Sequence, residues 1–227
     1  MFMTLSNKTY IAVIADIKES KKISNRNEVQ KQLGQVLTEI NEKYNNDIYS
    51  KFTITLGDEF QGLLCNGANT MNIISDIERR MFPVKLRFGI GIGEIITDVN
   101  KEISIGADGP AYHMARKAIE HLKADEKKKR TNTADTRIEI DGNEKAALLL
   151  NTILSLLTII KENWSDRQRE IIWDMLEHQD SQMSVANRLN IKQPSVQKSM
   201  SKGKYYASKD AMDTIGKILG EIRREDV

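Results

Sequence analysis

Three glycines at alternate positions constrain the fold of this chain more than any other sequence feature. Gly89, Gly91 and Gly93 lie in LRFGIGIGEI, an apolar, β-branched run that predicts a strand over residues 84–96. Because side chains alternate across a strand, one face of it is bare at these three positions. A bare face can admit a closely packed helix or a flat ligand, and helix packing is the more frequent cause.

The patterns around this strand predict an α/β sandwich with a mixed sheet over residues 1–141. The stretch 123–136 has no apolar period and predicts a solvated loop. The other expected elements are a strand at 10–15, a helix from Arg26, a hairpin at 51–56 and 60–64, a helix ending before Pro83, a helix from Pro110 and a strand at 137–140.

Charge, cysteine count and hydropathy narrow the class of protein to which this sequence can belong. Net charge is 34 − 32 = +2, so any nucleic-acid surface must come from local clustering. A single cysteine, Cys65, and the lack of an export signal suggest a cytoplasmic protein. The apolar segment 145–160 is shorter than the roughly 20 residues of a membrane span. We therefore expect no membrane partner and interpret residues 142–161 as an apolar connecting helix, either buried or at a dimer contact.

Two aspartates follow predicted strands in the first region. Asp16 comes where the first strand ends, and Asp58 lies in the hairpin turn. Adjacent strands could bring both carboxylates together with the carbonyl of Ile17, which would make a hard oxygen site for Mg²⁺ carrying a nucleotide triphosphate. The alternative is ordinary, because aspartate is common in solvated turns.

Four segments resemble, in order, parts of the class III nucleotide cyclases. IADIKES (14–20) resembles their first metal motif, LGDEFQGLL (56–64) their second metal hairpin, LRFGIGIGEI their core strand and GADGPAYHMARKAIE (106–120) their catalytic helix. With YIAVIADIKESKKI and FTITLGDEFQGLL, the region is most similar to the SatD family. Members of that family join a cyclase-like domain to a helix-turn-helix, so the resemblance implies a ferredoxin-like, cyclase-like sheet followed by a small all-α domain.

The resemblance also implies roles for individual residues. Asp16, Asp58 and the carbonyl of Ile17 match the metal site, which implies Mg²⁺ and a purine nucleotide. His113 and Lys117 occupy the places of the asparagine and arginine that act in cyclases, and are the expected catalytic pair. Lysine lacks the guanidinium fork, so a nucleotide sensor and an active cyclase both stay open. Further candidates for phosphate contacts are Lys18, Ser20, Arg26, Arg116 and the backbone at Gly109.

After Glu162 the sequence predicts a second domain over residues 162–227. Ser165 is expected to cap a helix at 166–177, and a short helix containing Ala186 precedes a turn at 190–192 and a helix opened by Gln193-Pro194. WSDRQREIIWDML…SVANRLNIKQPSVQKSM resembles the DNA-binding helix-turn-helix of bacterial regulators. A further amphipathic helix at 212–222 is expected to form a dimer contact or to close this domain's core.

The charge pattern of this domain points to DNA as well. No acid occurs in residues 181–209, which hold six cations: Arg188, Lys192, Lys198, Lys202, Lys204 and Lys209. By position, Gln193, Ser195 and Gln197 are candidates for base edges, and Lys198 and Lys202 for phosphates. The alternative is a protein-docking module with the same geometry.

Together these patterns predict a cytoplasmic, homodimeric DNA-binding regulator whose cyclase-like domain binds a purine nucleotide with Mg²⁺. Both resemblances imply the homodimer, because operators commonly have two half-sites and cyclases commonly build their sites across a dimer seam. The alternatives are an active metal-dependent nucleotidyl cyclase and a scaffold that binds only protein.

Overall fold

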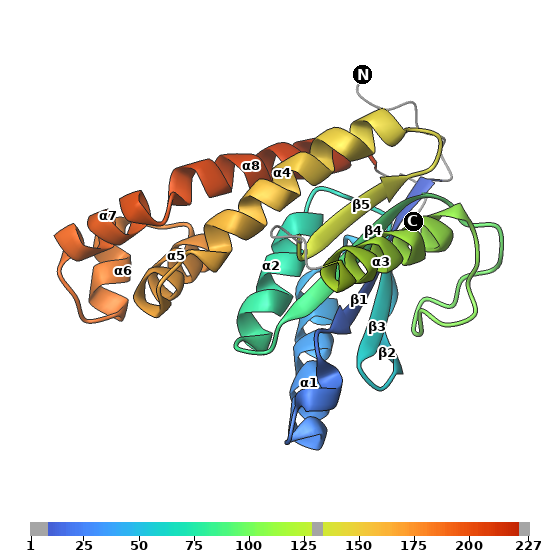
Figure 1. Ribbon diagram of the computed structural model, residues 1–227, viewed down its shortest axis with the longest axis horizontal. Coiled ribbons are helices and arrows are strands. Elements are labelled where there is room, and N and C mark those ends of the chain that lie inside the picture. Colours follow the sequence, from blue (N-terminus) through green and yellow to red (C-terminus); the bar gives the residue numbers. More distant parts are fainter. Residues whose placement is uncertain (1–8, 129–133, 223–227) are drawn as a thin grey trace.

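The protein is described by a computed structural model covering residues 9–128 and 134–222. A five-stranded sheet forms its centre, and the mixed α/β fold expected from the sequence is confirmed (Figure 1). β1 is antiparallel to both of its neighbours, and only β4 and β5 run parallel. The strand order is β2 (Ile48–Leu56), β3 (Glu59–Leu64), β1 (Thr9–Ile17), β4 (Leu86–Glu94) and β5 (Thr136–Ile140).

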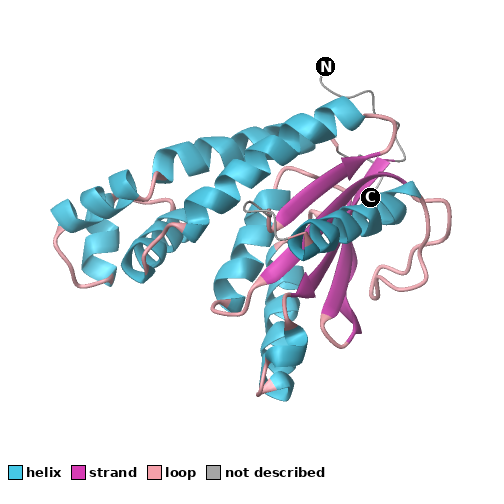
Figure 2. Ribbon diagram, in the orientation of Figure 1, coloured by secondary structure: helices cyan, strands magenta, loops and turns pink. Residues whose placement is uncertain are grey.

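The two faces of the sheet have different covers. On one face, Ala12 and Ile14 of β1 pack against α3 (Pro110–Lys127). On the other face, Ile11 and Val13 belong to the main core. That core is covered by α1 (Arg26–Lys43), α2 (Thr70–Met81) and α4 (Glu144–Glu162), as Figure 2 shows.

The alternate glycines of β4 admit the backbone of α3. A Cβ at Gly91 would lie 2.0 Å from the carbonyl oxygen of Ala111, and one at Gly89 would lie 2.4 Å from that of Ala115. Neither distance leaves room for a carbon atom, because the obstacle is helix backbone rather than a movable side chain. Helix packing, and not a flat ligand, therefore explains this series.

The expected solvated loop at 123–136 is corrected by the structure. α3 continues to Lys127, and β5 begins at Thr136. The last turns of α3 lack an apolar period because ion pairs attach them to the sheet: Lys123 contacts Asp16, and Glu126 contacts Arg87. Residues 129–133 of the expected loop lie outside the described residues.

α4 covers the open edge of the sheet. The side chain of Asn151 accepts a hydrogen bond from the backbone N–H of Ile138 and donates one to its carbonyl, each at 2.8 Å. Asn151 thus satisfies an edge strand that would otherwise present unpaired backbone groups. In the described part of the chain, no helix is both long and apolar enough to cross a membrane.

Three short helices follow and share a small apolar cluster. Ser165 accepts a bond from the backbone of Gln168 in a complete capping box, as the sequence predicts. Trp164 is buried in this cluster, and its Nε1 donates to the carbonyl of Gly203 at 2.7 Å. The helices are α5 (Asp166–His178), α6 (Gln182–Arg188) and α7 (Gln193–Lys202).

The last helix, α8 (Tyr205–Leu219), belongs to both parts of the molecule. Tyr205 is in the cluster of the three short helices, whereas Ile215, Leu219 and Ile222 lie in the core of the sheet. The backbone N–H of Gly67 donates to the carbonyl of Ile222 at 3.0 Å. α8 therefore contributes to the core of the sheet as well as to the small cluster, and the expected division at residue 162 stays a prediction.

Candidate functional site

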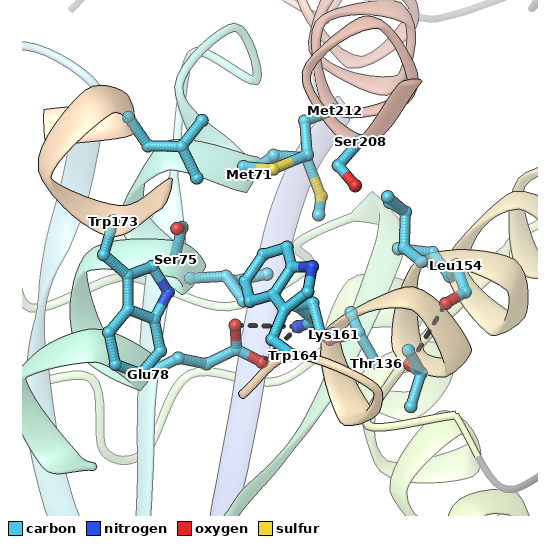
Figure 3. Close-up of a pocket in the computed structure, with 14 residues that line it drawn as sticks. Met71, Ser75, Glu78, Thr136, Leu154, Lys161, Trp164, Trp173, Ser208 and Met212 are labelled. Atoms are coloured by element: carbon cyan, nitrogen blue, oxygen red, sulfur yellow. Dashed lines mark hydrogen bonds and ion pairs between the residues drawn. The ribbon is translucent and has the colours of Figure 1, made fainter. Parts of the chain in front are cut away.

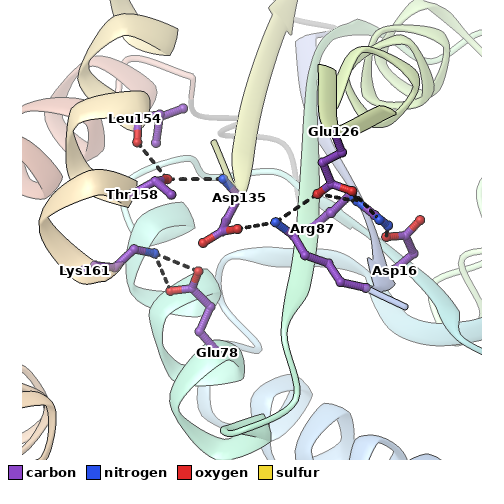
Figure 4. A network of polar contacts seen from close by, with 9 residues as sticks. Asp16, Glu78, Arg87, Glu126, Asp135, Leu154, Thr158 and Lys161 are labelled. Atoms are coloured by element: carbon purple, nitrogen blue, oxygen red, sulfur yellow. Dashed lines mark hydrogen bonds and ion pairs between the residues drawn. The ribbon is translucent and has the colours of Figure 1, made fainter. Parts of the chain in front are cut away.

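Asp16 lies at the end of β1, below the C-terminal half of α3. Its side chain is only 7% exposed, and both carboxylate oxygens have basic partners. Figure 4 shows the contact with Arg87. Oδ1 lies 2.6 Å from Nη1 of Arg87, and Oδ2 lies 2.5 Å from Nζ of Lys123. A buried carboxylate with two cationic partners is electrostatically satisfied within the chain itself.

These ion pairs continue into a chain of alternating charges. Arg87 also donates to Glu126, with Nη2 and Oε2 2.6 Å apart, and Glu126 lies 3.0 Å from Nζ of Lys18. Lys18 in turn binds Asp135 at the start of β5. Burial alone would raise the pKa of Glu126, but hydrogen bonds from Arg87 and Lys18 outweigh it and lower that pKa. For Lys18, burial opposes the charged form, yet Asp135 and Glu126 hold its pKa above the ordinary value.

Asp58 reaches the same end of the sheet through the hairpin turn. The backbone N–H of Ile17 donates to the carbonyl of Asp58 at 3.1 Å, which holds the turn beside the end of β1. Arg26 at the start of α1 lies 4.0 Å from the Asp58 carboxylate, and Gln30 donates to the carbonyl of Gly57 at 2.6 Å. The three expected metal ligands, Asp16, Ile17 and Asp58, are thus neighbours in space.

Their arrangement does not fit a divalent ion. Both oxygens of Asp16 already bind Arg87 and Lys123, so an ion would have to replace those side chains. Within residues 9–128 and 134–222, no group of three or more His, Cys, Asp or Glu side chains could hold a metal. The Asp16 carboxylate is therefore occupied by basic side chains of this chain and is not open to Mg²⁺ in this arrangement.

Of the other expected nucleotide contacts, Lys18 and Arg26 lie at this end of the sheet, whereas Gly109 does not. Lys18 is used in the charge chain, Arg26 is half-exposed beside Asp58, and Ser20 begins the short 3₁₀ turn η1 (Ser20–Lys22). Gly109 lies near the end of β4, where a Cβ would meet the carbonyl of Glu94 at 2.6 Å. Arg87 and Glu94 are separated by about 23 Å of strand, since each residue adds about 3.3 Å. Exposed Arg116 forms no hydrogen bond or ion pair through its side chain with another described residue.

The expected catalytic pair also lies away from the aspartates. His113 lies 2.8 Å from Asp108 before α3, and Lys117 lies 3.5 Å from Glu139 of β5. Ten residues of helix separate His113 from Lys123, the residue that touches Asp16, or about 15 Å at 1.5 Å per residue. One chain therefore does not assemble these groups into a single site.

Glu139, which sequence reasoning did not single out, is a second centre of charge. Its side chain is 8% exposed and is contacted by His121 at 2.9 Å and Arg137 at 2.8 Å, as well as by Lys117. Burial raises its pKa, but the bonds from Arg137 and His121 outweigh that effect and lower it. Lys117, the expected catalytic lysine, thus forms an ion pair with Glu139 in this chain.

One partner of Asp16, Arg87, could have been found from the glycine pattern. Arg87 is two residues before Gly89, so strand alternation places its side chain on the same face as the glycines, below α3. A cation on that buried face needs an acid nearby. Lys123, Glu126 and Asp135 carry no comparable signal, because they fall in the stretch that resembles a solvated loop.

α6 and α7 form the other candidate surface. Ser195, Gln197, Lys198 and Lys202 are exposed on α7, whereas Val196 and Met200 are buried in the small cluster. Two of the expected base-reading residues are tied to α6: Gln193 donates to Gln182 at 2.6 Å, and Gln182 donates to Gln197 at 2.5 Å.

The positive charge of this surface is smaller than the sequence count indicates. Arg188 lies 2.6 Å from Asp174 and 2.5 Å from Asp180, and Lys209 lies 2.5 Å from Asp213. The acids lie outside the acid-free run but fold back on it. Four of the six cations have no ion pair among the described residues: Lys192, Lys198, Lys202 and Lys204.

Comparison with protein families identifies the relationship. The model of the SatD family matches residues 10–212. The chain belongs to the SatD family. None of the curated proteins compared with it matches.

Solved structures similar to this SatD-family protein are distant. A bacterial light-regulated adenylyl cyclase is 14% identical, with 57% of this chain and 74% of that one covered and a TM-score of 0.41. The guanylate cyclase domain of RhGC from Catenaria anguillulae, solved with GTP, is 16% identical over 50% and 73%, with a TM-score of 0.35. The regulator of polyketide synthase expression from Bifidobacterium adolescentis is 13% identical over 92% and 86%, with a TM-score of 0.30.

In this SatD-family protein a cavity separates α2 from α4, α5 and α8 (Figure 3). Its walls are mainly apolar, and an ion pair between Glu78 and Lys161, 2.8 Å long, crosses between α2 and α4. Arg169 of α5 lies 4.9 Å from the ring of Phe82 and 5.2 Å from that of Trp173. These contacts attach α4 to α2, and α5 to the residue that follows α2.

Proposed function

We propose that this SatD-family protein is a cytoplasmic DNA-binding regulator that contacts the duplex through α7. The observation that carries the proposal is the group of four unpaired cations around an exposed helix face. Unpaired lysines on a rigid helix can neutralise DNA phosphates without first breaking an internal ion pair. Lys198 and Lys202 are the proposed phosphate contacts.

The amide side chains of α7 are the proposed readers of base edges. Gln193 and Gln197 are four residues apart and therefore share one side of the helix. Both bind Gln182 of α6, which fixes their orientation before any contact with DNA. Ser195 lies between them in sequence and is exposed. A glutamine amide can form two hydrogen bonds to adenine, so these residues have suitable chemistry for the major groove.

Duplex binding by the full chain tests this proposal. A duplex selected from a random library should bind at low salt, and Lys198→Ala should weaken binding to all duplexes by a similar factor. Gln197→Ala should instead alter the sequence preference. Lys217→Ala, which removes an exposed lysine from α8, is the matched control and should have little effect. A lack of affinity for every duplex at low salt would overturn the proposal.

Purine nucleotide binding with Mg²⁺ is the second candidate function. The hydrogen bond from Ile17 to Asp58 brings that turn beside Asp16, but a bound ion would have to displace Arg87 and Lys123 from the Asp16 carboxylate. Calorimetric titration with ATP and GTP, with and without Mg²⁺, tests it. Binding that requires Mg²⁺ and is lost in Asp16→Ala and Asp58→Ala would support it, whereas equal binding in these variants would reject it.

A metal-dependent nucleotidyl cyclase is the enzymatic alternative. Because His113 and Lys117 lie far from Asp16 in one chain, such an enzyme would need a homodimer in which one copy supplies the helix and the other the aspartates. Mass spectrometry after incubation with each NTP and Mg²⁺ or Mn²⁺ separates the alternatives. A cyclic product would support the enzyme, and unchanged bound nucleotide would support the sensor.

A further inference from the structure

One face of α4 is apolar yet exposed. We call it the α4 stripe, and the exposed fractions of Leu148, Leu149 and Leu156 are 68%, 56% and 57%. The sequence has no charged residue between Lys145 and Lys161, whereas the outer face of a surface helix is normally polar. Contiguous exposed apolar residues of this kind mark interaction surfaces. The α4 stripe consists of Leu148, Leu149, Thr152, Leu156 and Ile159.

The hydroxyl groups near the stripe are satisfied within the helix. Oγ1 of Thr152 donates to the carbonyl of Leu148 at 3.0 Å, and Oγ of Ser155 donates to that of Asn151 at 2.9 Å. Neither hydroxyl therefore needs an external acceptor for its proton. The surface is consequently suited to an apolar partner.

The stripe has the spacing of a helix-packing seam. Leu149, Thr152, Leu156 and Ile159 are separated by three, four and three residues, which is the pattern of a and d positions in a heptad. The opposite side of α4 is already buried, because Leu150, Leu154 and Leu157 lie in the core of the sheet. α4 therefore cannot bury the stripe by rotating. Another helix is the partner that this spacing fits.

We propose that the α4 stripe pairs with the same stripe of a second copy of this chain, in antiparallel orientation about a twofold axis. This proposal rests on the homodimer that the sequence analysis predicts for the regulator, and it names the surface of that homodimer. The charges at the ends of α4 select the orientation. Lys145 and Glu162 are exposed, and neither forms an ion pair within the described residues. Antiparallel pairing brings Lys145 of each copy near Glu162 of the other, whereas parallel pairing brings like charges together.

This interface would also fix the distance between the two copies of α7. α4 leads into α5 through residues 163–165 only, and α5 is fixed to α2 by Arg79 and Glu177, 2.8 Å apart. A twofold axis at α4 thus relates the two DNA-reading surfaces rigidly. Two-fold helix-turn-helix proteins use such an arrangement to contact half-sites on one face of the duplex.

Sedimentation velocity of the full chain tests the apolar part of the interface. The unmodified chain should be a dimer at micromolar concentration, and Leu149→Glu and Leu156→Glu should each raise the dissociation constant about 100-fold, because each places two charges in the interface. Ile96→Glu changes a residue that is 69% exposed in the loop after β4, and this control should remain dimeric. Far-ultraviolet circular dichroism checks that each variant is folded.

Charge exchange tests the orientation. Lys145→Glu and Glu162→Lys should each weaken the dimer about tenfold, and the double variant should restore it to within about threefold of the unmodified chain. Failure of the double variant to recover would reject antiparallel pairing. If the Leu149 and Leu156 variants remain dimeric, the proposed homodimer survives but uses another face, and this inference is wrong. A monomeric unmodified chain would overturn the homodimer too, while duplex and nucleotide binding are measured separately.

Discussion

The end of the sheet at Asp16 and the exposed face of α7 are both rich in charge, but they differ in how that charge is used. At Asp16, each cation has an acid within ion-pair distance: Arg87 and Lys123 contact Asp16, and Lys18 contacts Glu126. On α7, Lys198 and Lys202 have no acid partner among the described residues. The first arrangement stabilises the fold, and the second is available to a ligand. Charge composition alone does not separate the two.

The largest effect is expected at Arg87. Arg87→Ala leaves Asp16 and Glu126 without their shared partner in a setting where the arginine is 11% and Asp16 only 7% exposed. We expect a loss of about 3 kcal/mol in the free energy of unfolding, because Asp16 and Glu126 each lose one of their two basic partners. Urea denaturation measures it. Arg167→Ala, which breaks an exposed pair with Glu170, should cost less than about 0.5 kcal/mol. Equal losses would mean that the Asp16 pairs are no stronger than surface pairs.

A comparable but slightly smaller effect is expected where α3 meets the glycine face. Gly91→Ala places a Cβ 2.0 Å from the carbonyl of Ala111, so the helix must move away from β4 and loosen the nearby ion pairs. The expected loss is about 2 to 3 kcal/mol. Gly34→Ala in α1, where a Cβ would meet nothing within 4 Å, should instead stabilise the protein by up to about 1 kcal/mol. A neutral Gly91→Ala would show that α3 is not seated on this face.

Acid should weaken the charged end of the sheet in a defined direction. The pKa values of Glu126 and Glu139 lie below the ordinary value of 4.5, so their stabilising contribution is complete above that pH and is lost as pH falls through the lowered values. Urea midpoints recorded from pH 7 to pH 3 should therefore fall below pH 4.5. Glu139→Gln should flatten this fall, and an unchanged slope would show that Glu139 does not contribute to it.

The smallest effect on stability is expected on α7. Lys198→Ala should change the free energy of unfolding by less than about 0.5 kcal/mol, because the side chain is exposed and unpaired. The same variant should reduce the slope of log affinity for DNA against log salt by about 0.9, the value for one lost phosphate contact. A loss of stability above about 1 kcal/mol, twice the usual range for surface substitutions, would mark Lys198 as structural.

Much of the fold could be predicted because its core obeys simple periods. The helix from Arg26, the hairpin around Asp58 and the glycine strand are all observed. The predicted end of α3 was wrong. Ion pairs, and not apolar contacts, hold the last turns of this helix, so their residues show no apolar period. An amphipathic helix was predicted in the region of α8, but its partner was not. The apolar positions alone do not indicate that Ile215 and Leu219 reach the core of the sheet.

The site was harder to predict than the fold. The sequence predicted Asp16 at the end of a strand and Asp58 in a hairpin turn. The structure brings the end of that strand and the turn together. The basic partners of Asp16 come from β4 and α3, which are distant in sequence. Arg87 shares a strand face with the β4 glycines, whereas no local pattern reveals Lys123. For α7, a charge count over 181–209 missed Asp174 and Asp180, because they lie just outside that window and return to Arg188 through the fold.

The course of α8 has a practical consequence. Its first turn completes the cluster around Trp164, and its last turn fills the core beneath β1. A fragment that stops at Glu162 would keep every strand but lose Ile215, Leu219 and Ile222 from its interior. The two halves should therefore melt in a single cooperative transition, and neither should be expected to behave as an autonomous module when expressed alone.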